Sequence, residues 1–268
     1  MEGLCVLIVI RKQKHMEETY KEIAKQIRLR TLELVYKAKS SHIGSNFSLI
    51  DILTVLYEKV DFDKDEVIIS KGWAAASVYA TMERKGMIPK EELDTYCHPG
   101  SKYIGLLEPG VHPKIKVAGG SMNFGLPFAV GFALSKKMKG EEGKVYCIMS
   151  DGELAGGMIW ESALIASQHN LNNLIVLVDD NKLQAMGKSS GILRASFPVA
   201  GWDRVECLGH DYRDIEREIM TPSVHNLPKV ILFSTTKGRG VSFMENDNLW
   251  HYKDISDEVY EKAKAELI

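Results

Sequence analysis

Oxygen-bearing side chains follow two apolar runs in the middle of the sequence. The run 145–149 leads through Ser150 into Asp151, and the run 174–178 leads through two aspartates into Asn181. A short apolar run that stops at a carboxylate is typical of a buried strand ending at the carboxyl edge of a parallel sheet, where α/β proteins bind their ligands. Because neighbouring parallel strands end at the same edge, we expect Asp151 and Asn181 to lie side by side.

A carboxylate and an amide oxygen at one sheet edge suit a bound cation. Such hard oxygen donors fit Mg²⁺, or Ca²⁺, that also holds phosphate oxygens of a substrate or cofactor. Gly152, Gly156 and Gly157 follow Asp151 and open a helical pattern, which lets backbone N–H groups approach a diphosphate. The spacing fits equally well an ordinary strand–helix–strand unit in which Asp151 caps the helix and Asn181 lies in a turn.

The elements that must position these side chains alternate between strand and helix. Strands are predicted at 65–70, 145–149, 174–178, 205–208 and 230–233. Helices are predicted at 17–39, at 49–57 with Ser48 as cap, from 72 to 86, after Pro89, at 126–138, after Gly157, at 212–220 and at 256–267. This spacing predicts an α/β fold with a mostly parallel sheet and helices on both faces.

The composition indicates a folded cytoplasmic protein. The chain has 268 residues, of which 45% are hydrophobic, and a net charge of −2, so we expect neither nucleic acid nor a membrane as partner. The cysteines lack CxxC spacing and are typical of reduced thiols; they are Cys5, Cys97, Cys147 and Cys207. Residues 1–15 are expected to form an extension, as an edge strand or a disordered segment, ahead of one domain at 16–268.

Short motifs along the chain resemble those of the transketolase family. Asp151-Gly152, followed by the Asp-Asp-Asn-Lys of 179–182, is similar to the family's thiamine diphosphate motif. The other matching pieces, in the family's order, are 37–42 (KAKSSH), 69–72 (ISKG), 120–122 (GSM), 237–243 (KGRGVSF) and Trp250-His251. The resemblance runs from about residue 23 to residue 253 and implies a thiamine diphosphate-binding fold.

The resemblance also implies where a metal and the cofactor lie. Asp151 and Asn181 would bind Mg²⁺, or Ca²⁺, through their side chains, and Leu183 would bind it through its backbone carbonyl. Gly152 and Glu153 would lie against the cofactor beside this metal.

Two histidines carry the chemistry that the resemblance implies. His42 would line the substrate channel and help to move a proton at the donor's hydroxyl oxygens, a task suited to an imidazole that titrates near neutrality. His251 would lie close to the cofactor's diphosphate and a substrate oxygen. Gly120 and Met122 would approach the aminopyrimidine, with the Met122 carbonyl as a hydrogen-bond acceptor. Turn capping for His42 and a surface position for His251 are the alternatives.

Several positions depart from the family's pattern. Trp73 stands where the family has a histidine after Ser-Lys-Gly, and Leu106 stands in place of the histidine of Gly-His-Pro. Asn-Phe-Gly at 123–125 replaces Gly-Gln-Gly and adds bulk near the cofactor. His98 or His112 is an alternative source of the missing donors. A sugar donor would therefore bind less well, or differently.

The motifs match the amino-terminal half of a transketolase. This implies a split enzyme, active only with a carboxy-terminal subunit that holds the pyrimidine and supplies the acid at its N1′. The assembly would be α₂β₂ or larger, with a homodimer contact and an exposed apolar surface. The enzyme would transfer a two-carbon ketol unit between sugar phosphates, as in the pentose phosphate pathway. Another thiamine diphosphate-dependent C2 or acyl transfer, and a non-catalytic regulator or scaffold, are the alternatives.

Overall fold

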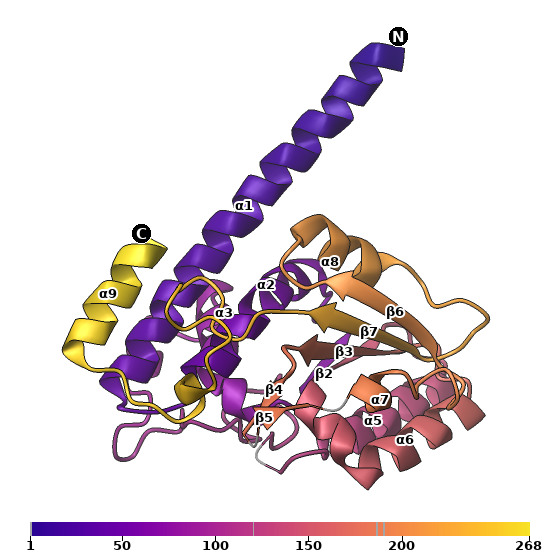
Figure 1. Ribbon diagram of the computed structural model, residues 1–268. Helices are drawn as coiled ribbons and strands as arrows, with labels where there is room; N and C mark the ends of the chain where they lie inside the picture. Colours follow the sequence, from indigo (N-terminus) through magenta and orange to yellow (C-terminus); the bar gives the residue numbers. More distant parts are fainter. Residues whose placement is uncertain (1, 120, 186, 190) are drawn as a thin grey trace.

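A sheet of five parallel strands, in the order β1-β2-β3-β7-β6, lies at the centre of the molecule (Figure 1). The computed structural model describes residues 2–119, 121–185, 187–189 and 191–268. The strands are β1 (Glu66–Ile69), β2 (Val145–Ser150), β3 (Leu174–Asp180), β7 (Lys229–Ser234) and β6 (Asp203–Leu208). Each of them matches a predicted strand, so the predicted α/β fold class is confirmed.

Helices cover both faces of this sheet. In β2, Tyr146 and Ile148 pack toward the first three helices, whereas Cys147 and Met149 pack toward α5 and α6. Because strand side chains alternate between the two faces, a sheet covered on both faces needs strands that are apolar throughout. The helices are α1 (Glu2–Lys37), α2 (Ile43–Lys59), α3 (Ala75–Arg84), α4 (Lys90–Leu93), α5 (Gly125–Lys139), α6 (Gly157–Gln168), α7 (Gly191–Arg194), α8 (Tyr212–Met220) and α9 (Asp257–Leu267).

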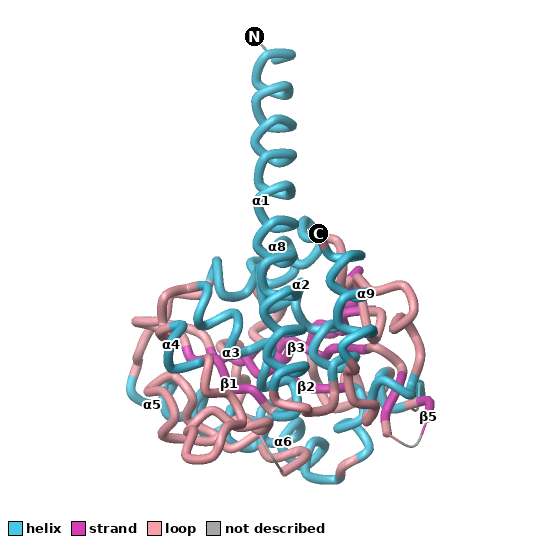
Figure 2. The backbone as a smooth tube through the Cα atoms, turned by 90° about the vertical axis from the view of Figure 1, so that its left-hand side faces the viewer, coloured by secondary structure: helices cyan, strands magenta, loops and turns pink. Residues whose placement is uncertain are grey.

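The first helix is longer than the sequence predicts. It begins at Glu2, so the prediction of an edge strand or a disordered segment at the amino terminus is wrong. The segment 4–16 contains neither proline nor glycine, so nothing in it stops the helix from continuing. Figure 2 shows this part of α1 standing clear of the sheet and the other helices. Within the described residues, no helix combines the length and the apolar character needed to cross a membrane.

The second helix begins earlier than predicted. It starts at Ile43, after His42 in the left-handed conformation with φ of 68°, rather than at 49. Ser48 is therefore inside the helix, where its hydroxyl donates to Asp179 Oδ2 at 2.6 Å instead of capping the helix. The polar residues of this first turn are buried, so they face the interior of the molecule and obscure the helical pattern in the sequence.

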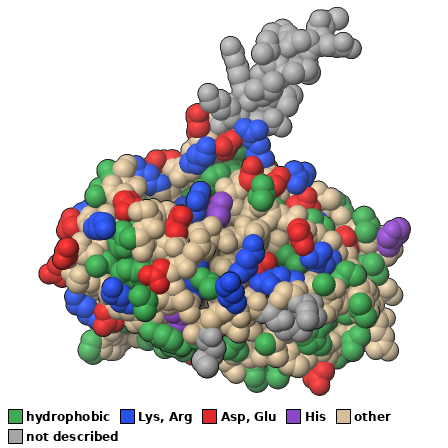
Figure 3. Space-filling model, viewed as in Figure 1, with side chains coloured by type: hydrophobic (Ala, Val, Ile, Leu, Met, Phe, Trp, Pro, Cys, Tyr) green, Lys and Arg blue, Asp and Glu red, His purple; other side chains and the backbone are tan. Residues whose placement is uncertain are grey.

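The strand register brings the polar ends of three strands together. Ser150 lies opposite Asp179, and Asp180 lies opposite Ser234. Beside this edge lie short elements that were not predicted, namely the antiparallel pair β4 (Leu183–Gln184) and β5 (Gly187–Lys188), helix α7, and the 3-10 helices η2 (Asp151–Ala155) and η3 (Asn248–His251). The face of the molecule shown in Figure 3 carries acidic and basic side chains interspersed.

Candidate functional site

Asp151 lies directly after β2, at the predicted edge, and is buried. Its carboxylate accepts a hydrogen bond from Ser189 Oγ and a second from Arg194 Nη2 at 3.2 Å. Burial raises the pKa of Asp151 to about 6, helped by the charges of Asp179 and Asp180 and opposed by the hydrogen bond from Ser189. A further positive charge beside Asp151 would stabilise the ionised form of this buried carboxyl group.

Arg194 supplies a positive charge at this edge. Its guanidinium donates to Asp180 Oδ1 at 2.6 Å and to Ser189 Oγ at 2.6 Å, in addition to Asp151. The side chain comes from α7 and is 14% exposed. Arg194 therefore holds together the ends of β2 and β3 at the place where a cation was predicted.

Asn181 lies directly after β3, at the same edge as Asp151. Its Oδ1 accepts from the Leu183 backbone N–H at 3.1 Å, and its Nδ2 donates to Ser48 Oγ at 3.4 Å. Lys182 between them has a left-handed φ of 65°, which turns the chain so that Leu183 follows at the edge. In the part of the chain that the structure describes, no three His, Cys, Asp or Glu side chains are grouped for a metal. A cation here would therefore need backbone carbonyl and ligand oxygens as further donors.

A buried ion pair ties the surrounding elements together. Asp179 is fully buried and pairs with Lys71 Nζ, while the hydroxyls of Ser48 and Thr235 also donate to it. Burial alone would raise the pKa of Asp179, but the charge of Lys71 and these hydrogen bonds hold it below its ordinary value. The pair joins the segment after β1 to β3, and the hydroxyls add α2 and the segment after β7.

Glu153 organises the start of η2. Its Oε2 accepts from the Ser150 backbone N–H at 2.7 Å and from Ser150 Oγ at 3.0 Å, which forms a capping box. Its Oε1 accepts from Ser70 Oγ and from the Asn123 backbone N–H, the latter at 3.2 Å. This buried carboxylate therefore fixes the end of β2, the end of β1 and the loop before α5 relative to one another.

The loop before α5 packs closely on this turn. A Cβ on Gly156 would lie 2.0 Å from Asn123 Nδ2, so only glycine permits this contact. Met122 is 56% exposed, and Gly120 lies outside the described residues. Asn123 Oδ1 is buried and accepts no hydrogen bond from the described residues. A free acceptor beside Met122 suits a ligand that carries a donor group.

The structure brings the rings of His42 and His251 together. Their ring centroids are 4.6 Å apart, and the indole of Trp73 stacks on His42 at 4.4 Å with an interplanar angle of 10°. Burial and neighbouring positive charge, including Lys237, lower the pKa of His42 to about 3 and that of His251 to about 4. The expectation that His42 titrates near neutrality is therefore wrong, because burial places its pKa well below 6.5. Both rings are neutral at pH 7.

The histidines proposed as alternative donors make other contacts. His112 Nδ1 accepts from the Lys114 backbone N–H at 3.1 Å within the loop 96–116. Among the described residues, no hydrogen bond or ring contact joins His98 or His112 to His42 or His251. At His42 the aromatic face of Trp73 covers one side of the ring.

Sequence reasoning did not single out several of these residues. Lys71, Asp179 and Lys237 belong to segments that resemble the family's motifs, so their place in those motifs was the available signal. Ser189 and Arg194 belong to no recognised motif, and their contacts with Asp151 are visible only in the folded chain.

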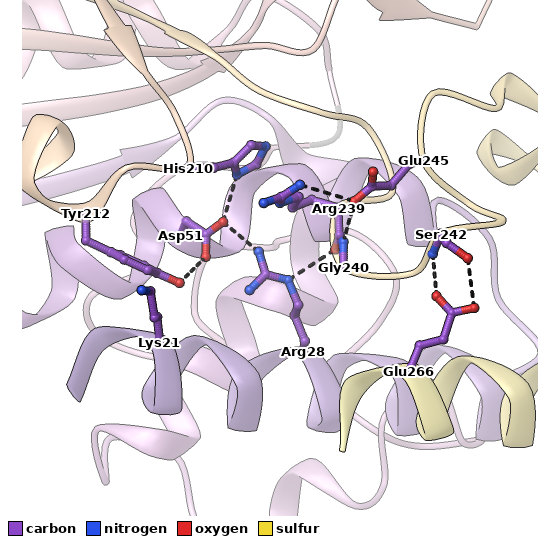
Figure 4. A pocket seen from close by; sticks show the side chains of 10 residues that line it. All are labelled: Lys21, Arg28, Asp51, His210, Tyr212, Arg239, Gly240, Ser242, Glu245 and Glu266. Atoms are coloured by element: carbon purple, nitrogen blue, oxygen red, sulfur yellow. Dashed lines mark hydrogen bonds and ion pairs between the residues drawn. The ribbon is translucent and has the colours of Figure 1, made fainter. Parts of the chain in front are cut away.

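A separate cavity of about 370 Å³ lies further along α2 (Figure 4). Asp51 in its wall accepts from Arg28 at 2.6 Å and from Tyr212 at 2.7 Å, and His210 Nδ1 lies 2.7 Å from the same carboxylate. His210 Nε2 in turn accepts from the Thr236 backbone N–H at 2.7 Å. Because these charged groups are paired with one another, we assign the cluster a structural role, supporting the loop after β7. The cavity is lined by Lys21, Arg28, Asp51, His210, Tyr212, Arg239, Gly240, Ser242, Glu245 and Glu266.

A parallel sheet with acidic and amide groups at its carboxyl edge is typical of α/β proteins that hold phosphate-bearing ligands. Residues 19–267 match the family model described as "Transketolase, thiamine diphosphate binding domain". The chain therefore belongs to the transketolase family and corresponds to its amino-terminal, thiamine diphosphate-binding part. This membership supports a transferase role.

The relatives are of two lengths. The chain is 34% identical over 270 residues to an apulose-4-phosphate transketolase subunit of Phocaeicola vulgatus, covering 93% of this chain and 94% of that protein. It is 32% identical over 259 residues to a 6-deoxy-6-sulfo-D-fructose transketolase subunit of a Clostridium species, covering 91% and 94%. The transketolase structure from Campylobacter jejuni superposes with a TM-score of 0.87 at 26% identity, covering 93% of this chain and 43% of that one.

Proposed function

We propose that this chain is the amino-terminal subunit of a split transketolase. With a carboxy-terminal, pyrimidine-binding subunit it transfers a two-carbon ketol unit from a ketose phosphate to an aldose phosphate, in the cytoplasm and within sugar-phosphate metabolism such as the pentose phosphate pathway. The observation that carries the proposal is the match over 94% of the length of relatives named as transketolase subunits, against 43% of the Campylobacter jejuni transketolase.

The proposed metal site uses Asp151, Asn181 and the Leu183 carbonyl for Mg²⁺ or Ca²⁺. Their position at adjacent strand ends and the raised pKa of Asp151 support it, because a cation would lower the cost of keeping this buried carboxylate ionised. Ser189 and Arg194 both donate to Asp151 Oδ2 in the structure, so a cation that binds this oxygen displaces them. Ser189 directly follows β5 and Arg194 ends α7, and both of these elements are short and lie outside the main sheet.

The cofactor is proposed to be thiamine diphosphate, bound along the same edge. When bound, it supplies the carbon nucleophile that carries the two-carbon unit. Gly152, at the start of η2, is proposed to present its backbone N–H to the diphosphate, and Glu153 keeps that turn in place. Gly120 and Met122 are proposed to lie against the aminopyrimidine, next to the free acceptor of Asn123.

His42 and His251 are proposed to bind the reacting sugar. As neutral rings beside each other they can donate to or accept from hydroxyl oxygens, but neither brings a positive charge. A second candidate function is another thiamine diphosphate-dependent C2 or acyl transfer with a changed donor. It is favoured by Trp73, whose indole covers His42 where the family has a polar histidine.

The proposed assembly is an α₂β₂ heterotetramer or larger. The outer surface of α5 and α6 supports it, because large apolar side chains remain exposed there in the single chain. The exposed fractions are 49% for Phe128, 37% for Met158, 60% for Leu164 and 45% for Ile165. We propose that this surface contains the contact between two copies of this chain.

Co-purification with the partner subunit followed by a donor panel tests the proposal. The complex is expected to exchange two-carbon units between ketose and aldose phosphates when thiamine diphosphate and Mg²⁺ are present. Mass spectrometry of the covalent adduct distinguishes the candidates, because a dihydroxyethyl adduct from ketose phosphates alone excludes decarboxylation. Cofactor binding without exchange for any donor in the panel would reject the transketolase assignment, and absence of cofactor binding would favour a regulator or scaffold.

A further inference from the structure

We propose that Lys237 is a positioning residue that fixes His251 as a neutral imidazole with its proton on Nε2. Only the role given to His251 rests on the proposed function. The position of the proton follows from contacts within this chain.

Lys237 is held rigidly in the loop after β7. The side chain is fully buried, and its stem lies over Gly44, where an added Cβ would come within 3.2 Å of Lys237 Cγ. The Gly238 N–H donates to the Gly44 carbonyl at 2.9 Å, and the Asn246 N–H donates to the Lys237 carbonyl at 2.8 Å. The ammonium group therefore has little freedom to leave its partners.

The partners of Lys237 Nζ are two acceptors. Nζ lies 2.8 Å from His251 Nδ1 and 2.8 Å from Asn248 Oδ1. The Asn248 amide is oriented independently, because its Nδ2 donates to the Gln184 carbonyl at 3.2 Å. Since an ammonium group has only donors, His251 Nδ1 must accept.

The proton of His251 is thereby placed on the other side of the ring. A neutral imidazole carries one proton, so with Nδ1 accepting it must lie on Nε2. A second proton on Nδ1 would point at the ammonium group. Burial, Lys237 and Lys71 lower the pKa of His251 to about 4, and the rings of His42 and Tyr252 face it without adding a negative charge.

A fixed Nε2–H suits one task in a sugar-phosphate site. A neutral donor stabilises negative charge that develops on a substrate or phosphate oxygen and does not give up its proton. Burial, with the charge of Lys71, lowers the pKa of Lys237 to about 8, although Asp151 and Asp179 oppose this. Below about pH 8 the Lys237 ammonium group keeps the His251 proton on Nε2. Above that pH, neutral Lys237 can accept a hydrogen bond from His251 Nδ1–H, so it no longer fixes the His251 tautomer.

Nitrogen-15 NMR of the full chain with labelled histidine tests the assignment, because ring shifts distinguish protonated from unprotonated nitrogens. His251→Gln identifies the signals. Between pH 6 and 7.5 we expect unprotonated Nδ1 and protonated Nε2. Protonated Nδ1 in the wild-type chain would overturn the proposal, whether or not any variant folds.

Lys237→Met is expected to give a mixture of tautomers and to raise the His251 pKa by about one unit or more. Lys229→Met is the matched control. This lysine begins β7, the strand that precedes the Lys237 loop, is 1% exposed, and donates to the Glu218 and Thr221 carbonyls. It should leave the His251 signals unchanged. An unchanged tautomer and pKa in a folded Lys237→Met variant would also refute the proposal.

Activity of the assembled complex gives a second readout. Lys237→Met should lower kcat by roughly ten- to a hundredfold, the usual range for losing a group that orients a functional histidine, with a smaller change in KM. In the NMR of the full chain, Lys237→Met should also remove the change in the His251 tautomer that we expect of the wild type above about pH 8. A wild-type complex without transketolase activity would reject the proposed function and leave the NMR result to decide on Lys237.

Discussion

Replacing Arg194 with methionine should increase the affinity of the site for a divalent cation. The guanidinium lies 3.2 Å from Asp151 Oδ2 and 2.6 Å from Asp180 Oδ1. A cation that binds Asp151 Oδ2 has to break only the longer of these two contacts. Hydrogen bonds to charged groups contribute about 1.5–3 kcal/mol net. Because this one is long, we take the lower end, about 1.5 kcal/mol, which corresponds to roughly tenfold in affinity.

Isothermal titration of Mg²⁺ into the assembled complex with thiamine diphosphate measures this change. The Arg194→Met complex should bind Mg²⁺ about tenfold more tightly. Without Mg²⁺ the variant should unfold at a lower temperature, because Asp151 and Asp180 lose the positive charge of the guanidinium. Arg213→Met is the control, since that arginine is 53% exposed and pairs with Glu17 on α1. Equal or weaker Mg²⁺ binding by Arg194→Met would refute the idea that this arginine competes with the metal.

Three further predictions concern the surroundings of the site. Lys71→Met should lower the unfolding free energy by about 3–5 kcal/mol, because it leaves Asp179 buried without a counter-charge; a loss below about 1 kcal/mol in urea denaturation would contradict this. His42→Gln should reduce the fall in melting temperature between about pH 6.5 and pH 4. The pKa of His42 is about 3 in the folded chain and about 6.5 in the unfolded chain, so the unfolded chain takes up the proton first as pH falls. An unchanged pH profile of the melting temperature would contradict this. Trp73→His should raise kcat/KM with ketose phosphates, and steady-state kinetics showing no gain would mean that the indole does not restrict the donor.

The predictable part of the site comes from strands with an unambiguous apolar pattern. The apolar runs that end in Asp151 and Asn181 are buried on both faces of a parallel sheet, so their period and their termini indicated both the fold and the edge. The sequence did not indicate the first turn of α2 because its polar residues, Ser45 and Asn46, are buried. Ser48, expected to cap the helix, lies in the next turn and donates to Asp179. Burial of polar groups at a site removes the contrast on which sequence patterns depend.

The remaining part depends on contacts between distant segments. Nothing in the sequence around Arg194 indicates that it reaches both Asp151 and Asp180. The prediction for the pKa of His42 is wrong for a related reason. It uses the pKa of an imidazole in water, and the side chain is buried in the folded chain. Here burial dominates, with positive charge from Lys237 arriving from another loop. Such shifts are set by tertiary packing.

The most direct test of the proposed site is thiamine diphosphate binding by the assembled complex carrying Asp151→Asn. Calorimetry with and without Mg²⁺ should show Mg²⁺-dependent binding in the wild type and a loss of roughly a hundredfold or more in the variant, the upper range for removing a metal-site group. Asp203→Asn, at the opposite end of the sheet where β6 begins, should bind like the wild type. Unchanged cofactor affinity in a folded Asp151→Asn complex would contradict a metal–diphosphate site at this edge.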